Sequence, residues 1–412
     1  MISHIKQALP IMQNFSYIFV LRILQRVIGF VSLYFIVRAL SQTDFGIYQF
    51  VLTVSVMLAP LALSGFHNVI TQSTARGALG AFWRLGKLGF LASFSGFLAL
   101  GCVAVYFLET GQGSTALGLC IVGLFFPMRQ GLQQWKYVYT GQEKFKELSL
   151  FSGGLTILTH TSLIALALMG SENFLFYVLV TVGIEGLFNV IMSAYVYWQI
   201  RSQDTKDDLE EGSIEYGLKT SLYAGLNALA SNIDKVLLFV FLSPATLAIF
   251  YAAERLSELV KNIVQDLAIV IAPRFARQEE YTAKLNKVIF WVSLVAGAGI
   301  IFAAFCLVPW FVVFLFGDEY VEAIPYAQAL MCTVAVANGS VLKFQFITSR
   351  FDFKGAKVIN YAMSFGRIAA SLLLVPFFGI IGAIISVSIS RLIVIISVEY
   401  IIRTGYLKEL PS

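Results

Sequence analysis

The sequence predicts an all-α integral membrane protein with about twelve transmembrane helices in two six-helix lobes, a parallel repeat, around a central cationic cavity. Hydrophobic residues make up 58% of the 412 residues and charged residues only 13%, whereas soluble proteins carry roughly 25% charged residues. Apolar runs near the length of a membrane span recur along the whole chain. Because strands of a membrane barrel would alternate in polarity, these runs indicate helices.

The predicted first lobe occupies residues 1–200, and its opening apolar run is too long for a signal peptide and lacks a small-residue cleavage site, so we expect it to be retained. Arg22 and Arg26 lie near the middle of this run on one helix face. The neighbouring span carries no acid at their level. The expected spans of this lobe are Ile11–Ala39, Phe45–Phe66, Leu85–Leu108, Thr115–Val138, Leu148–Met169 and Asn173–Gln199.

A polar segment rich in Asp and Glu, Arg201–Glu215, follows these spans. We interpret residues 201–217 as a cytoplasmic linker between the lobes.

The predicted second lobe, residues 218–412, begins with a hairpin. A short turn at residues 243–246 reverses the chain and brings Asp234 and Lys235 level with Glu254 and Arg255. These charges can form two pairs of opposite sign. The expected spans are Leu218–Leu242, Thr246–Ala272, Val288–Phe316, Ala323–Ile347, Ala356–Phe378 and Gly379–Ile402.

The last two spans form another hairpin, in which reversal at Gly379 makes Arg367 level with Arg391 near the membrane midplane. Two cations at one depth repel each other strongly in a low-dielectric medium. We therefore expect water, an acid or an anionic ligand between them.

The loop charges support this topology. About twenty Lys and Arg residues fall in the segments predicted to be cytoplasmic and one, Arg38, in the outside turns. Both termini are therefore predicted to be cytoplasmic. Two short matches support the repeat: Leu40–Tyr48 aligns with Leu242–Phe250, and Thr140 with Phe145-Lys146 aligns with Thr348 with Phe353-Lys354.

Cations outnumber acids inside the predicted spans. The buried cations are Arg22, Arg26, Lys235, Arg255, Lys261, Lys343, Arg367 and Arg391, and the buried acids are Glu185, Asp234, Glu254, Glu258 and Asp266. Charges at membrane depth are costly and mark functional sites. A surplus of arginines favours an anion, and phosphate matches the guanidinium group.

Structural explanations compete with functional ones. The cluster of Asp234, Lys235, Glu254 and Arg255 is either a clamp between two helices or a gating and coupling site. Glu185 is either a protonated packing residue or a proton site. We expect Lys343 to extend toward the membrane surface.

Glu258 has two interpretations of its own: an ion pair with Lys261 three residues later, or a part in ion coupling. The four cysteines lack metal-ligand spacing and are interpreted as packing residues. The sequence has no nucleotide-binding loop, so transport would be driven by a gradient or by substrate supply.

The chain resembles the Wzx-type polysaccharide flippases of the multidrug/oligosaccharidyl-lipid/polysaccharide exporter superfamily along almost its whole length. The residues that carry the resemblance are Arg38-Ala39-Leu40, Asp44-Phe45-Gly46-Ile47-Tyr48, Asn232 with Asp234-Lys235, Pro244, Ile249-Phe250-Tyr251-Ala252-Ala253-Glu254-Arg255, Ala272-Pro273-Arg274, Phe316-Gly317-Asp318-Glu319-Tyr320 and Gly379-Ile380-Ile381-Gly382-Ala383. Leu247-Ala248 departs from the pattern, which usually has an acidic or aromatic residue and Gly there.

The resemblance implies a bacterial inner-membrane flippase that carries an undecaprenyl-diphosphate-linked oligosaccharide, such as an O-antigen repeat unit, to the outer leaflet by alternating access. It implies a diphosphate and glycan cavity lined by Arg22, Arg26, Lys235, Arg255, Arg367 and Arg391, with gating or ion coupling by Asp234, Glu254, Glu185 and Glu258. No cofactor is expected, and H⁺ and Na⁺ both remain open as coupling ions.

Membrane lipid, a glycan polymerase and chain-length proteins are the expected partners, and nucleic acid is not. The main alternative is a cation-coupled multidrug exporter of the same superfamily, which would need a cavity dominated by acids. A membrane-embedded glycan polymerase or ligase is a further alternative, but the outside turns are too short for the large loop such enzymes carry.

Overall fold

The computed structural model describes residues 21, 23–201, 209–276, 282–349 and 353–404. Within these ranges all regular secondary structure is helical. Nine helices in the described part are long and apolar enough to cross a membrane. The predicted all-α membrane class is therefore confirmed. The count of twelve transmembrane helices remains a prediction, since residues 11–20 and 22 of the expected first span lie outside the described part.

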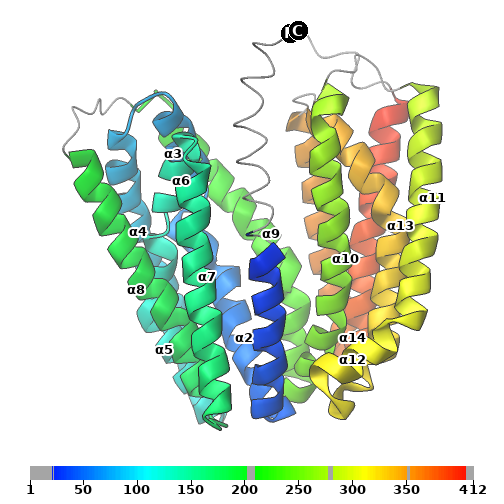
Figure 1. The fold of residues 1–412 in the computed structure, drawn as a ribbon, viewed down its shortest axis with the longest axis horizontal. Coiled ribbons are helices and arrows are strands. Elements are labelled where there is room, and N and C mark those ends of the chain that lie inside the picture. The colour runs from blue at the N-terminus through cyan, green and yellow to red at the C-terminus, as the bar shows by residue number, and fades with distance from the viewer. Residues whose placement is uncertain (1–20, 22, 202–208, 277–281, 350–352, 405–412) are drawn as a thin grey trace. The chain divides into compact units, whose positions relative to one another are not determined.

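By packing, the chain divides into two compact units, Met1–Ala228 and Leu229–Ser412. In the first unit residues 23–39 are helical. The elements that follow are α2 (Gln42–Leu58), η1 (Ala59–Ala62), α3 (Phe66–Ala75), α4 (Gly80–Glu109), α5 (Gly113–Gly131), α6 (Trp135–Gly141), α7 (Phe145–Leu168), α8 (Phe174–Arg201) and the start of α9 (Ser213–Phe241). Within this unit α5 packs against α4 and α8, and α7 packs against α8 (Figure 1).

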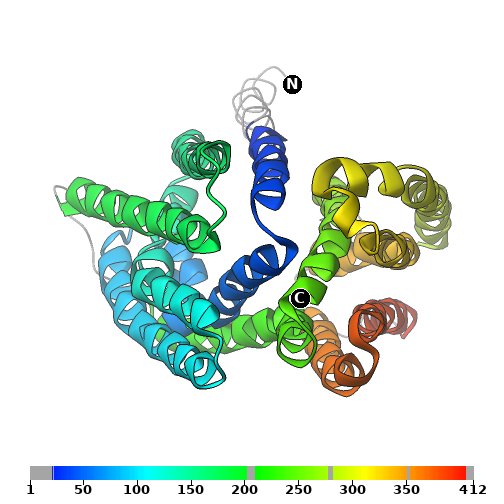
Figure 2. The same ribbon diagram turned by 90° about the horizontal axis from the view of Figure 1, so that it is seen from below.

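The second unit contains the end of α9 and the remaining helices. These are α10 (Pro244–Ala276), α11 (Ala283–Cys306), α12 (Val308–Phe316), η2 (Asp318–Tyr320), α13 (Ala323–Ser349) and α14 (Phe353–Arg403). Within this unit α13 is central, because it packs against α10, α11 and α14 (Figure 2). Residues of α13 therefore line both cavities of this unit that are described below.

The division between the units falls inside α9, whereas the sequence predicted a boundary at the linker, residues 201–217. The reason is a close approach between α9 and the start of α3. The backbone N–H of Gly65 donates to Ser221 Oγ at 2.9 Å, and the Gly217 carbonyl oxygen occupies the place a Cβ at Gly65 would take. The first part of α9 is thereby packed into the first unit, and the two-lobe division at the linker stays a prediction.

The two junctions that the sequence aligns have the same local structure. Ser41 Oγ accepts from the backbone N–H of Asp44 at 3.1 Å, and Ser243 Oγ accepts from that of Thr246 at 3.1 Å. A serine that accepts three residues ahead is an N-cap, which satisfies a helix donor that would otherwise lack a partner. The matched segments therefore start α2 and α10 by one mechanism, which supports the proposed repeat.

The hairpin predicted at Gly379 is present. Gly379 adopts φ 57° and ψ −130°, which interrupts α14 and which residues with a Cβ rarely adopt. The two branches then pack against each other, with Ile359 beside Val398 and the side chain of Ile393 against Gly366. Arg367 and Arg391, one and two residues from that contact, are therefore level, as predicted.

The predicted single span Val288–Phe316 is wrong, because the structure has two helices there, α11 and α12, that meet at Leu307. Pro309 lies in the first turn of α12. Proline lacks an N–H and its ring excludes the carbonyl four residues earlier, so it fits a helix start and not a helix interior.

Trp135 is the largest side chain with no exposed surface in the first unit. Its indole Nε1–H donates to Asn189 Oδ1 at 3.0 Å, and Asn189 Nδ2 donates to the Arg129 carbonyl oxygen at 3.0 Å. One amide on α8 therefore joins the end of α5 to the start of α6. This connection sets the positions of Arg129 and Lys136, the cations nearest to Trp135 along the chain.

Candidate functional site

The most buried charge of the second unit is Asp234 on α9, which has no exposed surface. Its carboxylate accepts from Arg367 Nη2 on α14 at 2.6 Å. It also accepts from the backbone N–H of Lys235 at 2.9 Å. A buried carboxylate is stable only when paired and hydrogen-bonded, and Asp234 meets both conditions.

Lys235 and Glu254 form the second pair of the cluster. Lys235 Nζ lies 2.8 Å from Glu254 Oε2, and the other oxygen of Glu254 lies 4.0 Å from Arg367. The short turn between α9 and α10 places these residues level, as the sequence predicted. Two pairs of opposite sign do form at this depth, but one of them recruits Arg367 from α14.

We refer to Asp234, Lys235, Glu254 and Arg367 as the buried charge cluster. Its two acids and two bases compensate each other. The sequence predicted an ion pair for Lys235 and left water, an acid or an anionic ligand open beside Arg367, and the structure shows that an acid, Asp234, lies there. The physical reason is lateral packing: α14 lies close enough to α9 for the guanidinium to reach Asp234. The cluster alone therefore offers no excess charge to an anion.

Arg391 differs from its neighbour Arg367. Its guanidinium donates to the Leu330 carbonyl oxygen at 2.9 Å and to Thr333 Oγ1, both on α13. Within the described residues it forms no ion pair. Neutral acceptors hold this group in place without cancelling its charge, so Arg391 keeps the excess charge that the sequence predicted for the last hairpin.

A cavity of about 260 Å³ opens beside Arg391. Lys261 on α10 also lines it, together with the amide side chains of Gln265, Asn338 and Asn360. Lys261 Nζ lies 3.8 Å from Oε1 of Glu258, which is three residues earlier. The predicted ion pair between these two residues is therefore present. We refer to this space as the Arg391 cavity. Eight of its fourteen lining residues are apolar, and no acid is among the described residues that line it.

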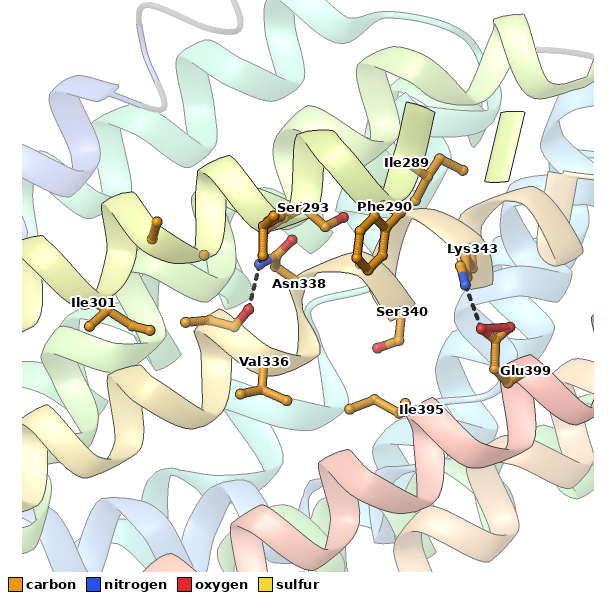
Figure 3. A pocket seen from close by; sticks show the side chains of 15 residues that line it. Ile289, Phe290, Ser293, Ile301, Val336, Asn338, Ser340, Lys343, Ile395 and Glu399 are labelled. Atoms are coloured by element: carbon orange, nitrogen blue, oxygen red, sulfur yellow. Dashed lines mark hydrogen bonds and ion pairs between the residues drawn. The ribbon is translucent and has the colours of Figure 1, made fainter. Parts of the chain in front are cut away.

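A second cavity, about 410 Å³, lies on another side of α13, between α11 and α14. Its lining is mainly apolar, with Ile301, Val336 and Ile395 among the side chains in Figure 3. At one end Lys343 Nζ lies 2.7 Å from Glu399 Oε1. Lys343 therefore has an ion-pair partner on α14 that the sequence did not predict, and its extension toward the membrane surface stays a prediction.

In the first unit Glu185 is not a lone acid. Arg129 Nε donates to Glu185 Oε2, and Arg129 Nη1 donates to Ser55 Oγ at 3.2 Å. The sequence left Glu185 as either a protonated packing residue or a proton site. The ion pair contradicts the first interpretation and leaves the second a prediction. The pair forms because α5 packs directly against α8.

The remaining predicted site residues are less informative. Arg22 lies outside the described residues. Arg26 is half-buried on the helix of residues 23–39, and Arg255 is half-buried on α10 beside Glu254. The sequence interpretation missed Arg129, Glu399 and Thr333 as partners. A signal existed for Arg129, because an acid in the middle of α8 requires a cation from a neighbouring helix.

A comparison with known protein families shows to which family this chain belongs. The model of the family described as "Polysaccharide biosynthesis protein" matches residues 11–279. The chain belongs to the polysaccharide biosynthesis protein family. Arg367 and Arg391 lie beyond the matched residues, so the family model covers one side of the charge cluster and not the other. No curated protein matches this polysaccharide biosynthesis family member.

Solved structures show the same fold. An inward-facing multidrug resistance transporter of the MOP superfamily is 12% identical with a TM-score of 0.70, and the match covers 94% of this chain and 96% of that one. The lipid II flippase MurJ in an inward closed conformation is 13% identical with a TM-score of 0.64, covering 95% and 94%.

A third structure is a MOP superfamily transporter from Pyrococcus furiosus, at 14% identity and a TM-score of 0.63, covering 96% and 95%. Its description states that the reversed polarity of its binding pocket suggests a different function. This polysaccharide biosynthesis family member therefore has the fold of MOP superfamily transporters, and that fold is found with pockets of different charge. Its fold and its long apolar helices are those of a multi-pass membrane protein.

Proposed function

We propose that this protein moves an undecaprenyl-diphosphate-linked oligosaccharide, such as an O-antigen repeat unit, from the cytoplasmic to the outer leaflet of the bacterial inner membrane. The observation that carries the proposal is the Arg391 cavity, in a chain of a polysaccharide biosynthesis family. Two cations and three amides lie in its otherwise mainly apolar lining, and none of the described lining residues is an acid. Arginine binds phosphate through two parallel hydrogen bonds, and lysine adds a point charge.

In this proposal the diphosphate of the substrate lies between Arg391 and Lys261. The guanidinium already donates to Thr333 and to the Leu330 carbonyl. A phosphate oxygen would replace a neutral acceptor with a charged one, and hydrogen bonds to charged groups are the stronger ones. Arg22, Arg26 and Arg255 are proposed to serve the same anion elsewhere along its path. Both chain ends are proposed to be cytoplasmic.

The buried charge cluster is proposed to couple transport to an ion. Glu254 contacts two cations, Lys235 at 2.8 Å and Arg367 at 4.0 Å. A proton or a Na⁺ ion bound to the Glu254 carboxylate would neutralise its charge. Lys235 and Arg367 would then lose this ion-pair partner, and α9 and α14, which carry them, would separate from α10. Asp234, Glu185 and Glu258 are the other acids proposed to take part. A glycan polymerase and chain-length proteins are the proposed partners.

Arg391→Gln should slow translocation about tenfold, because a charged hydrogen bond to phosphate is replaced by a neutral one. The measurement is translocation of a fluorescent polyprenyl-diphosphate oligosaccharide by the protein in liposomes. Arg403→Gln is the matched control: this arginine lies on the same helix and is exposed, so its loss should leave the rate unchanged. A wild-type rate in Arg391→Gln would remove the Arg391 cavity as the diphosphate site.

The alternative function is export of cationic drugs, since one structure with this fold is described as a multidrug resistance transporter. The Arg391 cavity would repel such compounds, since Arg391 has only neutral hydrogen-bond partners among the described residues and the charge of Lys261 is the one that Glu258 compensates. Uptake of a radiolabelled cationic drug into inverted vesicles distinguishes the two functions. Drug uptake without translocation of the lipid-linked sugar would favour the exporter.

A further inference from the structure

The first unit contains a polar cavity of about 310 Å³ between α2, α5, α6, α7 and α8. All of its lining residues except Leu155 and Leu163 carry polar side chains. Buried polar groups in a membrane protein are costly unless they bind one another, water or a ligand, and polar clusters there mark binding sites. We call this space the N-terminal polar cavity; of its lining residues, only Glu185 enters the function proposed above.

The cavity carries one excess positive charge. Arg129 and Glu185 both line it and form an ion pair, so their charges compensate. Lys136 is the other charged residue of the lining. Among the described residues no carboxylate lies within ion-pair distance of it. Its ammonium lies 5.7 Å from the centre of the Trp135 ring, a contact that leaves the charge in place.

Uncharged hydrogen-bonding groups surround this charge. Thr159 on α7 is only 5% exposed, and its hydroxyl has no partner among the described residues. Gln133 donates to Gln130 Oε1 at 2.9 Å, which leaves the Gln130 amide nitrogen and the Gln133 amide oxygen as further donor and acceptor sites. A buried hydroxyl without a partner costs free energy unless a ligand completes its hydrogen bonds.

We propose that the N-terminal polar cavity binds one sugar residue with a single negative charge, a hexuronic acid. Lys136 binds the sugar carboxylate, and Thr159, Gln130 and Gln133 bind the ring hydroxyls, which both donate and accept hydrogen bonds. The volume is at the lower end of ligand pockets, about 300–1,000 Å³, as suits one ring. The inference rests on the proposed function in one respect: the sugar belongs to the transported glycan.

The test is calorimetric titration of the purified full-length protein with methyl β-glucuronide and with methyl β-glucoside. The charged sugar should bind about tenfold more tightly than the neutral one. Lys136→Gln should abolish that difference. Lys146→Gln, which removes an exposed lysine of α7, should retain it as the matched control.

Thr159→Val separates binding from folding. Since the Thr159 hydroxyl has no partner among the described residues, its removal should leave the melting temperature unchanged or higher, while it weakens binding of both sugars. The proposal is overturned if neither sugar shows saturable binding or if Lys136→Gln binds both sugars as the wild type does. It is also overturned if inorganic phosphate, titrated in the same way, binds as tightly as the glucuronide.

This titration contains no lipid, so its outcome is independent of the flippase assay. Binding of the glucuronide together with a wild-type translocation rate in Arg391→Gln would retain the sugar site and reject the diphosphate site. Slow translocation in Arg391→Gln without glucuronide binding would do the reverse.

Discussion

Asp234→Ala should destabilise the folded protein by about 3–5 kcal/mol, because it leaves the Arg367 guanidinium buried without its partner. Asp234 has no exposed surface, and the Arg367 side chain is 16% exposed, so water cannot replace the lost carboxylate. Glu254, at 4.0 Å from Arg367, is already bound to Lys235. The measurement is the free energy of unfolding in mixed micelles.

The double variant Asp234→Asn with Arg367→Gln is the control for charge. It removes both members of the pair, so no charge is left alone, and most of the lost stability should return. If Asp234→Asn alone and Arg367→Gln alone are each as stable as the wild type, the pair contributes nothing to folding. Translocation by the stable double variant then separates the two interpretations of the cluster: a clamp tolerates the change, whereas a coupling site does not.

Gly65→Ala should destabilise the protein by about 3 kcal/mol, near the upper end of the range for overpacking. A Cβ at Gly65 would overlap the Gly217 carbonyl oxygen and the Ser221 backbone nitrogen. Both are backbone atoms, which cannot rotate away as a side chain can. The start of α9 would have to move from the first unit, with loss of the hydrogen bond from Gly65 N–H to Ser221 Oγ.

Gly86→Ala on α4 is the matched control for this glycine. A Cβ there meets no atom within 4 Å. Alanine is better than glycine in a helix by about 1 kcal/mol, so this variant should be slightly more stable than the wild type. Melting temperatures of the two variants in the same detergent give the comparison. If both variants melt alike, the close approach of α9 is not required for folding.

The sequence predicted the hairpins of this protein well. The turn at residues 243–246 and the glycine at 379 are local features, and each fixes which residues are level in the two helices that it joins. The pair of Lys235 with Glu254 and the shared level of Arg367 and Arg391 follow from them. Hydropathy likewise established the helical membrane class, because its physical cause, the exclusion of backbone and charge from lipid, acts on each segment separately.

Lateral neighbours were decided only by the tertiary structure. The partners of Arg367 and Glu185 lie more than fifty residues away on helices that no turn connects to them. Chain length and loop charge do not determine which helix faces pack together, so a count of buried cations and acids gave a surplus but could not say which cations are paired. Packing placed the excess charge at Arg391 and Lys136, since these two cations have only neutral contacts within the described residues.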